Sequence, residues 1–441
     1  MEHFDLCVIG SGTGNSLIGP EFSHWRVALV EGGTFGGTCL NRGCIPTKML
    51  WAAAHAADVR GAAKLGVHAS AEVFWPEVRD RVFSRIDPIS ASGEQWRESN
   101  PNVTLYRTWG AFTAPGVLAV GDEQITADRF VIAAGSRPHI PQVFPEDPRI
   151  HTSDTIMRIP ELPKRLVIVG GGAIAAEFAY IFAAFGVEVT LLHRGPRLLR
   201  TADEQVAERF TQLLGGRVNL RLRQEVISVD VSGEVVWLLT RDPDGIEYSF
   251  EGDLVLVATG RVPSDVGAPA AGIVTSDGRI IVDEYQRANV PGVWALGDVS
   301  SPVQLKHLAN AEARTVRHNL LHEDLIATDK RYVPRAVFSG PEVAWVGATE
   351  QELRGQPYAA TVREYSSVAY GWALEDTDHF VKLLTDKGIL LGAHIVGPQA
   401  ATLLQPLIGA MGRNAHDVAR GQYWIHPALA EVVENALLDT P

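Results

Sequence analysis

Short apolar runs that stop at glycines recur along the chain and predict strands followed by tight turns. The run at 4–9 leads into Gly10 and Gly12, and a second apolar run ends at Glu31. An acid at this distance from a glycine turn is typical of a βαβ unit, in which amides at a helix N-terminus hold a pyrophosphate and the carboxylate accepts a ribose hydroxyl. Asn15 stands where the third small residue of that motif is usual. The pattern nevertheless predicts a first dinucleotide-binding module.

The same pattern restarts in the middle of the chain. An apolar run at 165–169 leads into Gly170 and Gly172, and Ala175 completes the motif. The apolar runs that close the two modules also end alike, in Gly135 and Gly260. Two copies of one module, the second inserted into the first, explain this internal repeat.

The second module carries basic residues where the first has an acid. Arg194 and Arg200 follow the strand that ends at His193. Guanidinium groups suit a 2′-phosphate, whereas a carboxylate at this place favours NAD. A solvated basic loop is the alternative explanation. We therefore expect NADPH at the second module.

Outside the two modules, the pattern indicates helices, a strand meander and a third domain. Residues 50–98 have helical spacing, and residues 104–132 alternate as strands. Later strands lead into Gly297 and Asp298, and this aspartate is placed to hydrogen-bond a polyol or phosphate of the first dinucleotide. From about residue 331, strands and helices alternate without glycine turns, which indicates an assembly domain.

These elements predict an α/β fold with two Rossmann-like dinucleotide-binding domains, the second inserted in the first, and a C-terminal α+β domain. A chain of 441 residues is too long for one ordinary core, which agrees with several domains. The expected boundaries are 1–148 and 266–330 for the first domain, 149–265 for the second and 331–441 for the third.

Composition limits the class of partner and the compartment. A net charge of −13 offers no basic stripe for a nucleic acid. The most apolar segment, 166–192, holds three consecutive glycines and Glu177, so it does not read as a membrane span. Three cysteines are too few for a secreted disulfide scaffold, and the N-terminal segment lacks a cationic signal. We expect a cytoplasmic protein without nucleic-acid, membrane or metal binding.

Two of the three cysteines, Cys39 and Cys44, lie in one glycine-rich stretch. Five positions apart on a regular helix, they would be separated by roughly 7.5 Å of rise and would point apart, which excludes a disulfide. A bridge therefore requires Cys39 to lie on a loop that runs into a helix, with a bend that Gly43 permits. Pro46 suits the first turn of that helix, so Cys44 is expected near its N-terminus, where a thiolate is stabilised. Two incidental cysteines are the alternative to a redox-active pair.

The chain resembles the pyridine nucleotide–disulfide oxidoreductases in its cysteine stretch, its two modules, Gly297 with Asp298, and the terminal His426 with Glu431. The resemblance covers essentially the whole chain, and the Cys-x4-Cys stretch is specific to that family. Within the family, five segments look most like the mycothione reductases, namely 35–49, 85–89, 151–155, 368–372 and 421–437.

The resemblance implies FAD in the first module and NADPH in the second, with electrons passing from NADPH through the flavin to the cysteines. The residues implied at FAD are Gly10, Gly12, Glu31, Lys48, Gly135 and Asp298. The residues implied at NADPH are Gly170, Gly172, Ala175, Arg194, Arg200 and Gly260. An ion pair of Lys48 with Glu177 is implied near the flavin.

The resemblance also implies catalytic roles. Cys44 is expected to be the thiolate next to the flavin, and Cys39 the interchange thiol that attacks the substrate. His426 is expected to be the general acid and base, oriented by Glu431. Because that histidine serves the cysteines of the partner subunit in this family, a homodimer is implied.

The expected substrate is a low-molecular-weight disulfide, and the resemblance favours mycothiol disulfide, which would yield two thiols. Glutathione disulfide and lipoamide are the alternatives within the family. Arginines suited to NADPH count against a lipoamide dehydrogenase, which normally works with NAD. A flavin-binding scaffold without turnover is the alternative from another class, and the presence of both cysteines with His426 and Glu431 counts against it.

Overall fold

In the computed structural model, which describes all 441 residues, the chain forms two compact units. Unit 1 contains Met1–Thr47, Arg79–His139 and Arg261–Lys330, and unit 2 contains Lys48–Val78, Ile140–Gly260 and Arg331–Pro441. Each unit therefore gathers segments that are far apart in the sequence. None of the helices combines the length and the apolar composition that a membrane span requires.

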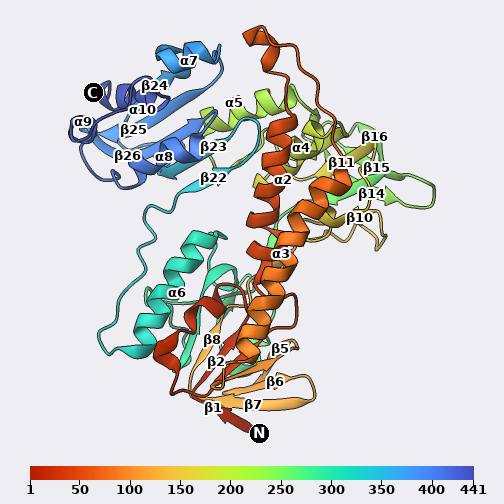
Figure 1. Ribbon diagram of the computed structural model, residues 1–441, viewed down its shortest axis with the longest axis vertical. Coiled ribbons are helices and arrows are strands. Elements are labelled where there is room, and N and C mark those ends of the chain that lie inside the picture. The colour runs from red at the N-terminus through yellow and green to blue at the C-terminus, as the bar shows by residue number, and fades with distance from the viewer. The chain divides into compact units, whose positions relative to one another are not determined.

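The centre of unit 1 is a parallel five-stranded sheet of order β21-β8-β2-β3-β4. Figure 1 labels its strands β2 and β8. Its strands are β2 (Leu6–Ile9), β3 (Val27–Val30), β4 (Val103–Tyr106), β8 (Phe130–Ile132) and β21 (Val293–Ala295). Alternate side chains serve different cores: Cys7 and Ile9 pack with a β-meander, whereas Leu6 and Val8 pack with helix α6 (Lys306–Leu321). Because both faces are covered, these strands are uninterrupted apolar runs.

The meander that covers this sheet has the strand order β1-β7-β6-β5. Its strands are β1 (Glu2–Phe4), β5 (Gly110–Ala114), β6 (Val117–Val120) and β7 (Glu123–Ala127). Two short pairs complete the strands of unit 1, β9 (Ser136–Pro138) with β18 (Arg261–Pro263) and β19 (Thr275–Ser276) with β20 (Arg279–Ile280). The strands predicted over 104–132 are present, and those at 110–127 form the meander, whereas β4 and β8 at the two ends of this range belong to the parallel sheet.

Unit 2 repeats the arrangement in a parallel sheet of order β10-β17-β11-β12-β13. Its strands are β10 (Ile150–His151), β11 (Arg165–Val169), β12 (Glu188–His193), β13 (Asn219–Leu222) and β17 (Leu254–Val257). Strand β11 corresponds to β2, because each precedes a glycine turn and lies between the strand that closes its module and the next strand. The predicted internal repeat is therefore confirmed.

Further elements cover this second sheet. Helix α4 (Ala173–Ala184) packs on β11 and β12, and α5 (Glu204–Gly215) packs on β13. An antiparallel sheet of order β14-β15-β16 follows, formed by β14 (Glu225–Asp230), β15 (Val236–Arg241) and β16 (Glu247–Gly252).

The C-terminal part of unit 2 is an antiparallel sheet of order β22-β23-β26-β25-β24 with four helices. Its strands are β22 (Arg335–Val337), β23 (Val343–Gly347), β24 (Ala359–Glu364), β25 (Phe380–Asp386) and β26 (Ile389–Val396). Its helices are α7 (Ala369–Ala373), α8 (Ala400–Ile408), α9 (Ala415–Arg420) and α10 (Ala430–Leu438). Helix α8 packs on β23 and β26, and α10 packs on β24 and β25 (Figure 1). The predicted α/β class with a C-terminal α+β part is confirmed.

The continuous helical segment predicted over 50–98 is wrong. Helix α2 (Cys44–Ala57) and helix α3 (Trp75–Glu98) are separated by a stretch that contains only a short 3-10 helix, η3 (Ala62–Leu65). Alanine-rich composition favoured a helix there. Gly61 precedes the 3-10 helix. Gly66, in the left-handed conformation, follows the 3-10 helix and ends it.

The α-helix expected after the first glycine turn is also absent. The turn leads into two 3-10 helices, η1 (Gly14–Leu17) and η2 (Pro20–Phe22). Arg97 of α3 donates to the backbone oxygens of Asn15 at 2.7 Å and Ile18 at 2.8 Å. The guanidinium thus satisfies carbonyl groups that a longer helix would have bonded internally.

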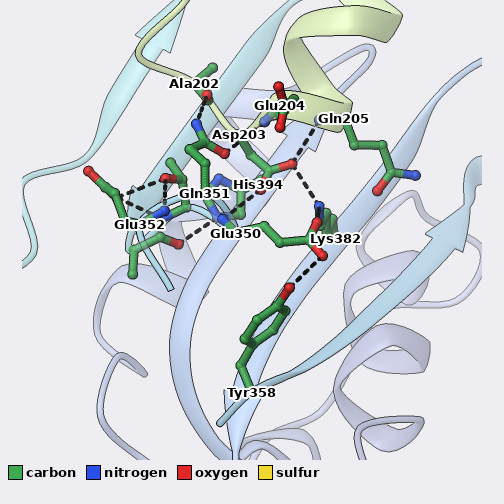
Figure 2. Close-up of polar contacts among 12 residues, drawn as sticks. Ala202, Asp203, Glu204, Gln205, Glu350, Gln351, Glu352, Tyr358, Lys382 and His394 are labelled. Carbon is green, nitrogen blue, oxygen red and sulfur yellow. Dashed lines mark hydrogen bonds and ion pairs between the residues drawn. The ribbon is translucent and has the colours of Figure 1, made fainter. Parts of the chain in front are cut away.

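A buried charged cluster connects the nucleotide module of unit 2 with its C-terminal sheet. Lys382 on β25 and Asp203 before α5 are both fully buried, and the ammonium donates to Asp203 Oδ1 at 2.8 Å and to Glu350 (Figure 2). Asp203 also accepts the amides of Glu350 at 3.0 Å and of Gln205 at 3.2 Å. Burial raises the pKa of Asp203, but His394 and Lys382 more than offset this and hold the pKa below its usual value. These contacts fix the two parts of unit 2 to each other.

Candidate active site and cofactor sites

Two short helices carry the cysteine pair in unit 1. Cys39 lies in α1 (Gly37–Arg42), and Cys44 is the first residue of α2. The expectation that Cys39 lies on a loop is wrong, because α1 is helical through Arg42. Gly43, with φ −139° and ψ −121°, interrupts the helical path between the two cysteines. This break brings the thiols within hydrogen-bonding contact, and Cys44 begins a helix as predicted.

Both cysteines are free thiols in the structure, and their side chains are hydrogen-bonded to each other. The hydrogen bond from Cys44 lowers the pKa of Cys39 to about 7, although burial opposes this effect. The same hydrogen bond, together with burial, raises the pKa of Cys44. The sequence argument placed the thiolate on Cys44 because of the helix N-terminus. The contact between the thiols outweighs the amide contribution, so the more acidic thiol in the structure is Cys39.

The first glycine turn forms an open cradle after β2. A Cβ at Gly10 would lie 2.3 Å from the carbonyl oxygen of Ala133, so only glycine fits between the strands there. Glu31, which follows β3, accepts from the amide of Ser11 at 2.9 Å and from the amide of Gly33 at 2.6 Å. These bonds fix the carboxylate beside the turn, at the place where a ribose hydroxyl is held in this motif.

Asp298 lies shortly after β21, which is an edge strand of the parallel sheet in unit 1. Its Oδ2 accepts from Ser136 Oγ at 2.6 Å, and Arg261 Nε donates to the same hydroxyl at 2.9 Å. A Cβ at Gly135 would meet no atom within 4 Å. The open space at Gly135, the glycine turn and two fixed carboxylates fit a dinucleotide such as FAD.

The ammonium of Lys48 lies over two aromatic rings in unit 2. Its Nζ lies 3.3 Å from the ring centre of Trp51 and 3.5 Å from that of Phe338. Burial lowers the pKa of Lys48, and the charges of Glu342 and Glu177 oppose this. Glu177 Oε1 also accepts the amide of Phe338 at 2.9 Å. The rings and Glu342 were missed from the sequence, although the spacing of Lys48 and Trp51 puts them on one helix face.

The second glycine turn precedes α4. A Cβ at Gly170 would lie 2.3 Å from the carbonyl oxygen of Ala258, the counterpart of the contact at Gly10. Gly172 caps α4 without a side-chain hydrogen bond, and a Cβ there would meet no atom within 4 Å, as at Gly260. Ala175 is fully buried against the sheet. The free amides and the open space fit the pyrophosphate of a nicotinamide dinucleotide.

The basic residues expected at the 2′-phosphate surround His193. Burial lowers the pKa of His193, and the charges of Arg194 and Arg200 lower it further. Both arginines are exposed. Arg197 instead pairs with Glu204 at 2.8 Å. The two exposed guanidinium groups near the second turn fit a phosphate-bearing nucleotide.

His426 and Glu431 form a dyad in unit 2. His426 Nδ1 lies 2.7 Å from Glu431 Oε1, and Ala428 N donates to Glu431 Oε2 at 3.0 Å. The hydrogen bond with His426 lowers the pKa of Glu431. The imidazole is largely exposed, at 72%. A carboxylate that holds Nδ1 leaves Nε2 free to exchange a proton with another molecule.

Known proteins share both the sequence and the fold. Residues 4–314 match the family described as pyridine nucleotide-disulphide oxidoreductase, and residues 333–437 match its dimerisation domain. Mycothione reductase of Mycobacterium tuberculosis (strain ATCC 25618 / H37Rv) is 51% identical and covers 99% of each chain. Glutathione reductase of Burkholderia cepacia is 32% identical and covers 97% of each chain.

A solved structure also matches the chain. The HOCl-induced flavoprotein disulfide reductase RclA from Escherichia coli has a TM-score of 0.86 at 25% identity and covers 99% of each chain. The family matches confirm the dimerisation domain expected after residue 331. Enzymes of this family use FAD and a pyridine nucleotide. The chain therefore belongs to the pyridine nucleotide–disulfide oxidoreductase family.

Proposed function

We propose that the protein is an NADPH-dependent mycothione reductase, which reduces mycothiol disulfide to two thiols. The observation that carries the substrate is the 51% identity over 99% of the chain to mycothione reductase of M. tuberculosis. The matched glutathione reductase is considerably more distant, at 32% identity. Arg194 and Arg200 beside His193 support NADPH over NADH.

The reducing half of the reaction uses the cysteine pair. When bound, FAD supplies two-electron transfer from the nicotinamide to this pair. The Gly10–Glu31 cradle and Asp298 would hold it, and Lys48 would lie near its flavin. The cofactor residues and the catalytic roles below are part of this proposal.

The disulfide exchange uses the hydrogen-bonded pair of thiols, of which Cys39 is the more acidic. The Cys39 thiolate attacks one sulfur of the substrate, and the substrate S–S bond breaks. The leaving thiolate takes a proton from the imidazolium of His426 and departs as the first thiol. His426 then accepts the Cys44 proton, and Cys44 attacks Cys39. The second thiolate leaves with that proton, and a Cys39–Cys44 disulfide remains.

Assembly follows from the dimerisation domain. We propose a homodimer in which the partner subunit's His426, oriented by its glutamate, protonates the thiolate that leaves the substrate when Cys39 attacks it. The exposure of the imidazole supports a donor that acts outside its own fold. A cytoplasmic location is part of this proposal, because three cysteines are too few for a secreted disulfide scaffold.

A substrate panel tests this function. The purified flavoprotein is assayed with mycothiol disulfide, glutathione disulfide and lipoamide, each with NADPH and with NADH, and thiol release is measured. We expect the highest kcat/KM for mycothiol disulfide with NADPH, by at least 100-fold over the other disulfides. Comparable values for glutathione disulfide or lipoamide would refute the substrate, and nucleotide oxidation without thiol release would refute the reductase.

A further inference from the structure

His193, the last residue of β12, lies against the second glycine turn. A Cβ on Gly171 would lie 2.4 Å from both Cε1 and Nδ1 of this imidazole, and a Cβ on Gly195 would lie 2.6 Å from its Nε2. Both glycines therefore leave room for the ring, which is half-buried. The amide of Leu199 donates to the carbonyl of Gly171 at 2.8 Å, so the segment that follows the histidine also folds back onto the turn. The imidazole lies between the turn and this segment.

The internal repeat makes His193 the counterpart of Glu31. The amide of Gly10 donates to the carbonyl of the residue before Glu31 at 2.8 Å, and the amide of Gly170 donates to the carbonyl of the residue before His193 at 3.0 Å. The strand pairs that precede the two glycines have the same register. The second module therefore has an imidazole at the position where the first has the carboxylate proposed to hold a ribose hydroxyl.

The charged groups on the segments that adjoin the ring are mostly positive. The glycine turn itself carries no charged side chain. The charged residues are Arg194, Arg197 and Arg200 on the ring's own segment, Arg223 after β13, and Glu204 of α5, which pairs with Arg197 at 2.8 Å. A negatively charged group at this position is therefore favoured by its surroundings.

The free imidazole is mostly neutral near neutral pH. Burial lowers the pKa of His193, a hydrogen bond with the backbone of Arg197 opposes this, and the charges of Arg194 and Arg200 lower the pKa further. A phosphate dianion beside the ring acts in the opposite direction, because it stabilises the imidazolium. A ligand that carries a phosphate here would therefore bind together with a proton from the solvent.

We propose that His193 contacts the 2′-phosphate of NADPH and takes up a proton when this phosphate binds, so that the preference for NADPH over NADH is stronger in mildly acidic than in alkaline solution. The inference rests on the proposed use of NADPH and deepens it. His193 is then a residue that determines coenzyme specificity, in addition to the two exposed arginines.

A ring that only fills the space between two glycines predicts a different result. NADPH and NADH differ only in the 2′-phosphate, so a change in a filling side chain would affect both equally at every pH. Glutamine keeps a donor and an acceptor at this position but cannot take up a proton. Glutamate would restore the acid of the first module, which suits a ribose hydroxyl and repels a phosphate.

Calorimetric titration of the FAD-loaded enzyme measures binding and proton uptake without turnover. The ligands are 2′,5′-ADP, which carries the 2′-phosphate of NADPH, and 5′-ADP, which lacks it. Each is titrated at pH 6.5 and pH 8.5, in two buffers of different ionisation enthalpy. We expect the wild type to bind 2′,5′-ADP at least about 100-fold more tightly than 5′-ADP at pH 6.5.

The variants separate the proton from the phosphate. His193→Gln should reduce the affinity ratio about tenfold at pH 6.5 but less than about threefold at pH 8.5, and should take up fewer protons than the wild type at pH 6.5. The phosphate itself titrates near about pH 6, but it does so equally in every variant. His193→Glu should bind 5′-ADP in preference to 2′,5′-ADP. His68→Gln, at an exposed site between α2 and α3, should follow the wild type.

Several outcomes would overturn the proposal. One is an equal loss of affinity for both ligands in His193→Gln, and others are an equal reduction of the ratio at both pH values or an unchanged proton uptake. If His193→Gln does not retain FAD, His193→Ile is the second variant without a titrating group and is held to the same criteria. A wild type that binds the two ligands equally would refute the NADPH assignment itself, and with it this inference.

Discussion

Removing the ammonium of Lys382 is the sharpest test of the buried cluster in unit 2. Lys382 and Asp203 are both 0% exposed, so Lys382→Met leaves a carboxylate without its cation and without water. Breaking such a pair from one side costs about 3–5 kcal/mol. The contact with Glu350 adds less than about 1 kcal/mol, because that side chain is 36% exposed and can be hydrated. We therefore expect a loss of about 4 kcal/mol.

Urea unfolding followed by fluorescence and circular dichroism measures this loss. With a denaturant slope of about 3 kcal/mol/M, a loss of about 4 kcal/mol lowers the midpoint by about 1.3 M. The control is Lys387→Met, which removes an exposed lysine from the turn of the same β-hairpin and should stay within about 0.5 kcal/mol. The double variant Asp203→Asn/Lys382→Met should lose less stability than the sum of the losses of the single variants, because it leaves no unpaired carboxylate or ammonium buried. A loss below about 1 kcal/mol for Lys382→Met, or strict additivity, would refute this reasoning.

The pH dependence has a definite sign. In the wild type, the pKa of Asp203 lies below its unfolded value, so the ion pair stabilises the fold above about pH 4 and loses this effect as the pH falls. Without Lys382, its hydrogen bond and its charge no longer lower the pKa of Asp203 while burial still raises it, so this pKa lies higher than in the wild type. Keeping this carboxylate ionised in the folded variant then costs more free energy as the pH rises above the pKa of Asp203 in the unfolded chain. The difference between wild type and Lys382→Met should therefore be larger at pH 8 than at pH 5.

Four further variants test the proposed roles. Cys39→Ser should accept electrons from NADPH but reduce no disulfide, because the attacking sulfur is gone; continued thiol release would exclude the interchange role. His426→Ala should lower kcat by about 100-fold or more, as loss of a general acid does. Glu431→Gln should lower kcat less, because the acid itself remains. An equal loss of kcat in both variants would contradict the assignment of His426 as the acid and Glu431 as the orienting group. Arg194→Ala with Arg200→Ala should raise KM for NADPH at least about tenfold but KM for NADH less than about threefold, and equal changes would reject the NADPH preference.

Local spacing explains what the sequence could predict. Gly10 and Glu31 act through a single turn and two adjacent strands, so their positions in the chain already determine their geometry. The same holds for His426 and Glu431, which are five residues apart. Prediction failed where helix formation depends on distant side chains, as in the 3-10 helices that Arg97 supports.

The buried contacts of unit 2 join residues that are far apart in the chain, so local spacing could not predict them. Lys382 stands in the apolar strand β25 and gives no sign of its partner, because Asp203 is 179 positions away in the chain. The setting of Lys48 is similar, since Phe338 comes from a separate segment of the chain. The helical position of Cys39 was missed for a different reason. A loop was expected there because a regular helix cannot bring the two cysteines together, whereas in the structure Gly43 alone interrupts the helical path between two helices.

The dyad of His426 and Glu431 has a consequence for dissociated subunits. Its bonds, including the one from the amide of Ala428, close within six consecutive residues of one chain. In the proposed homodimer, separation of the protomers would therefore leave the hydrogen bond at Nδ1, and with it the tautomer, in place. On that proposal dilution stops turnover only because the imidazole is separated from the cysteines of the partner subunit, and reassociation restores turnover without rebuilding the dyad.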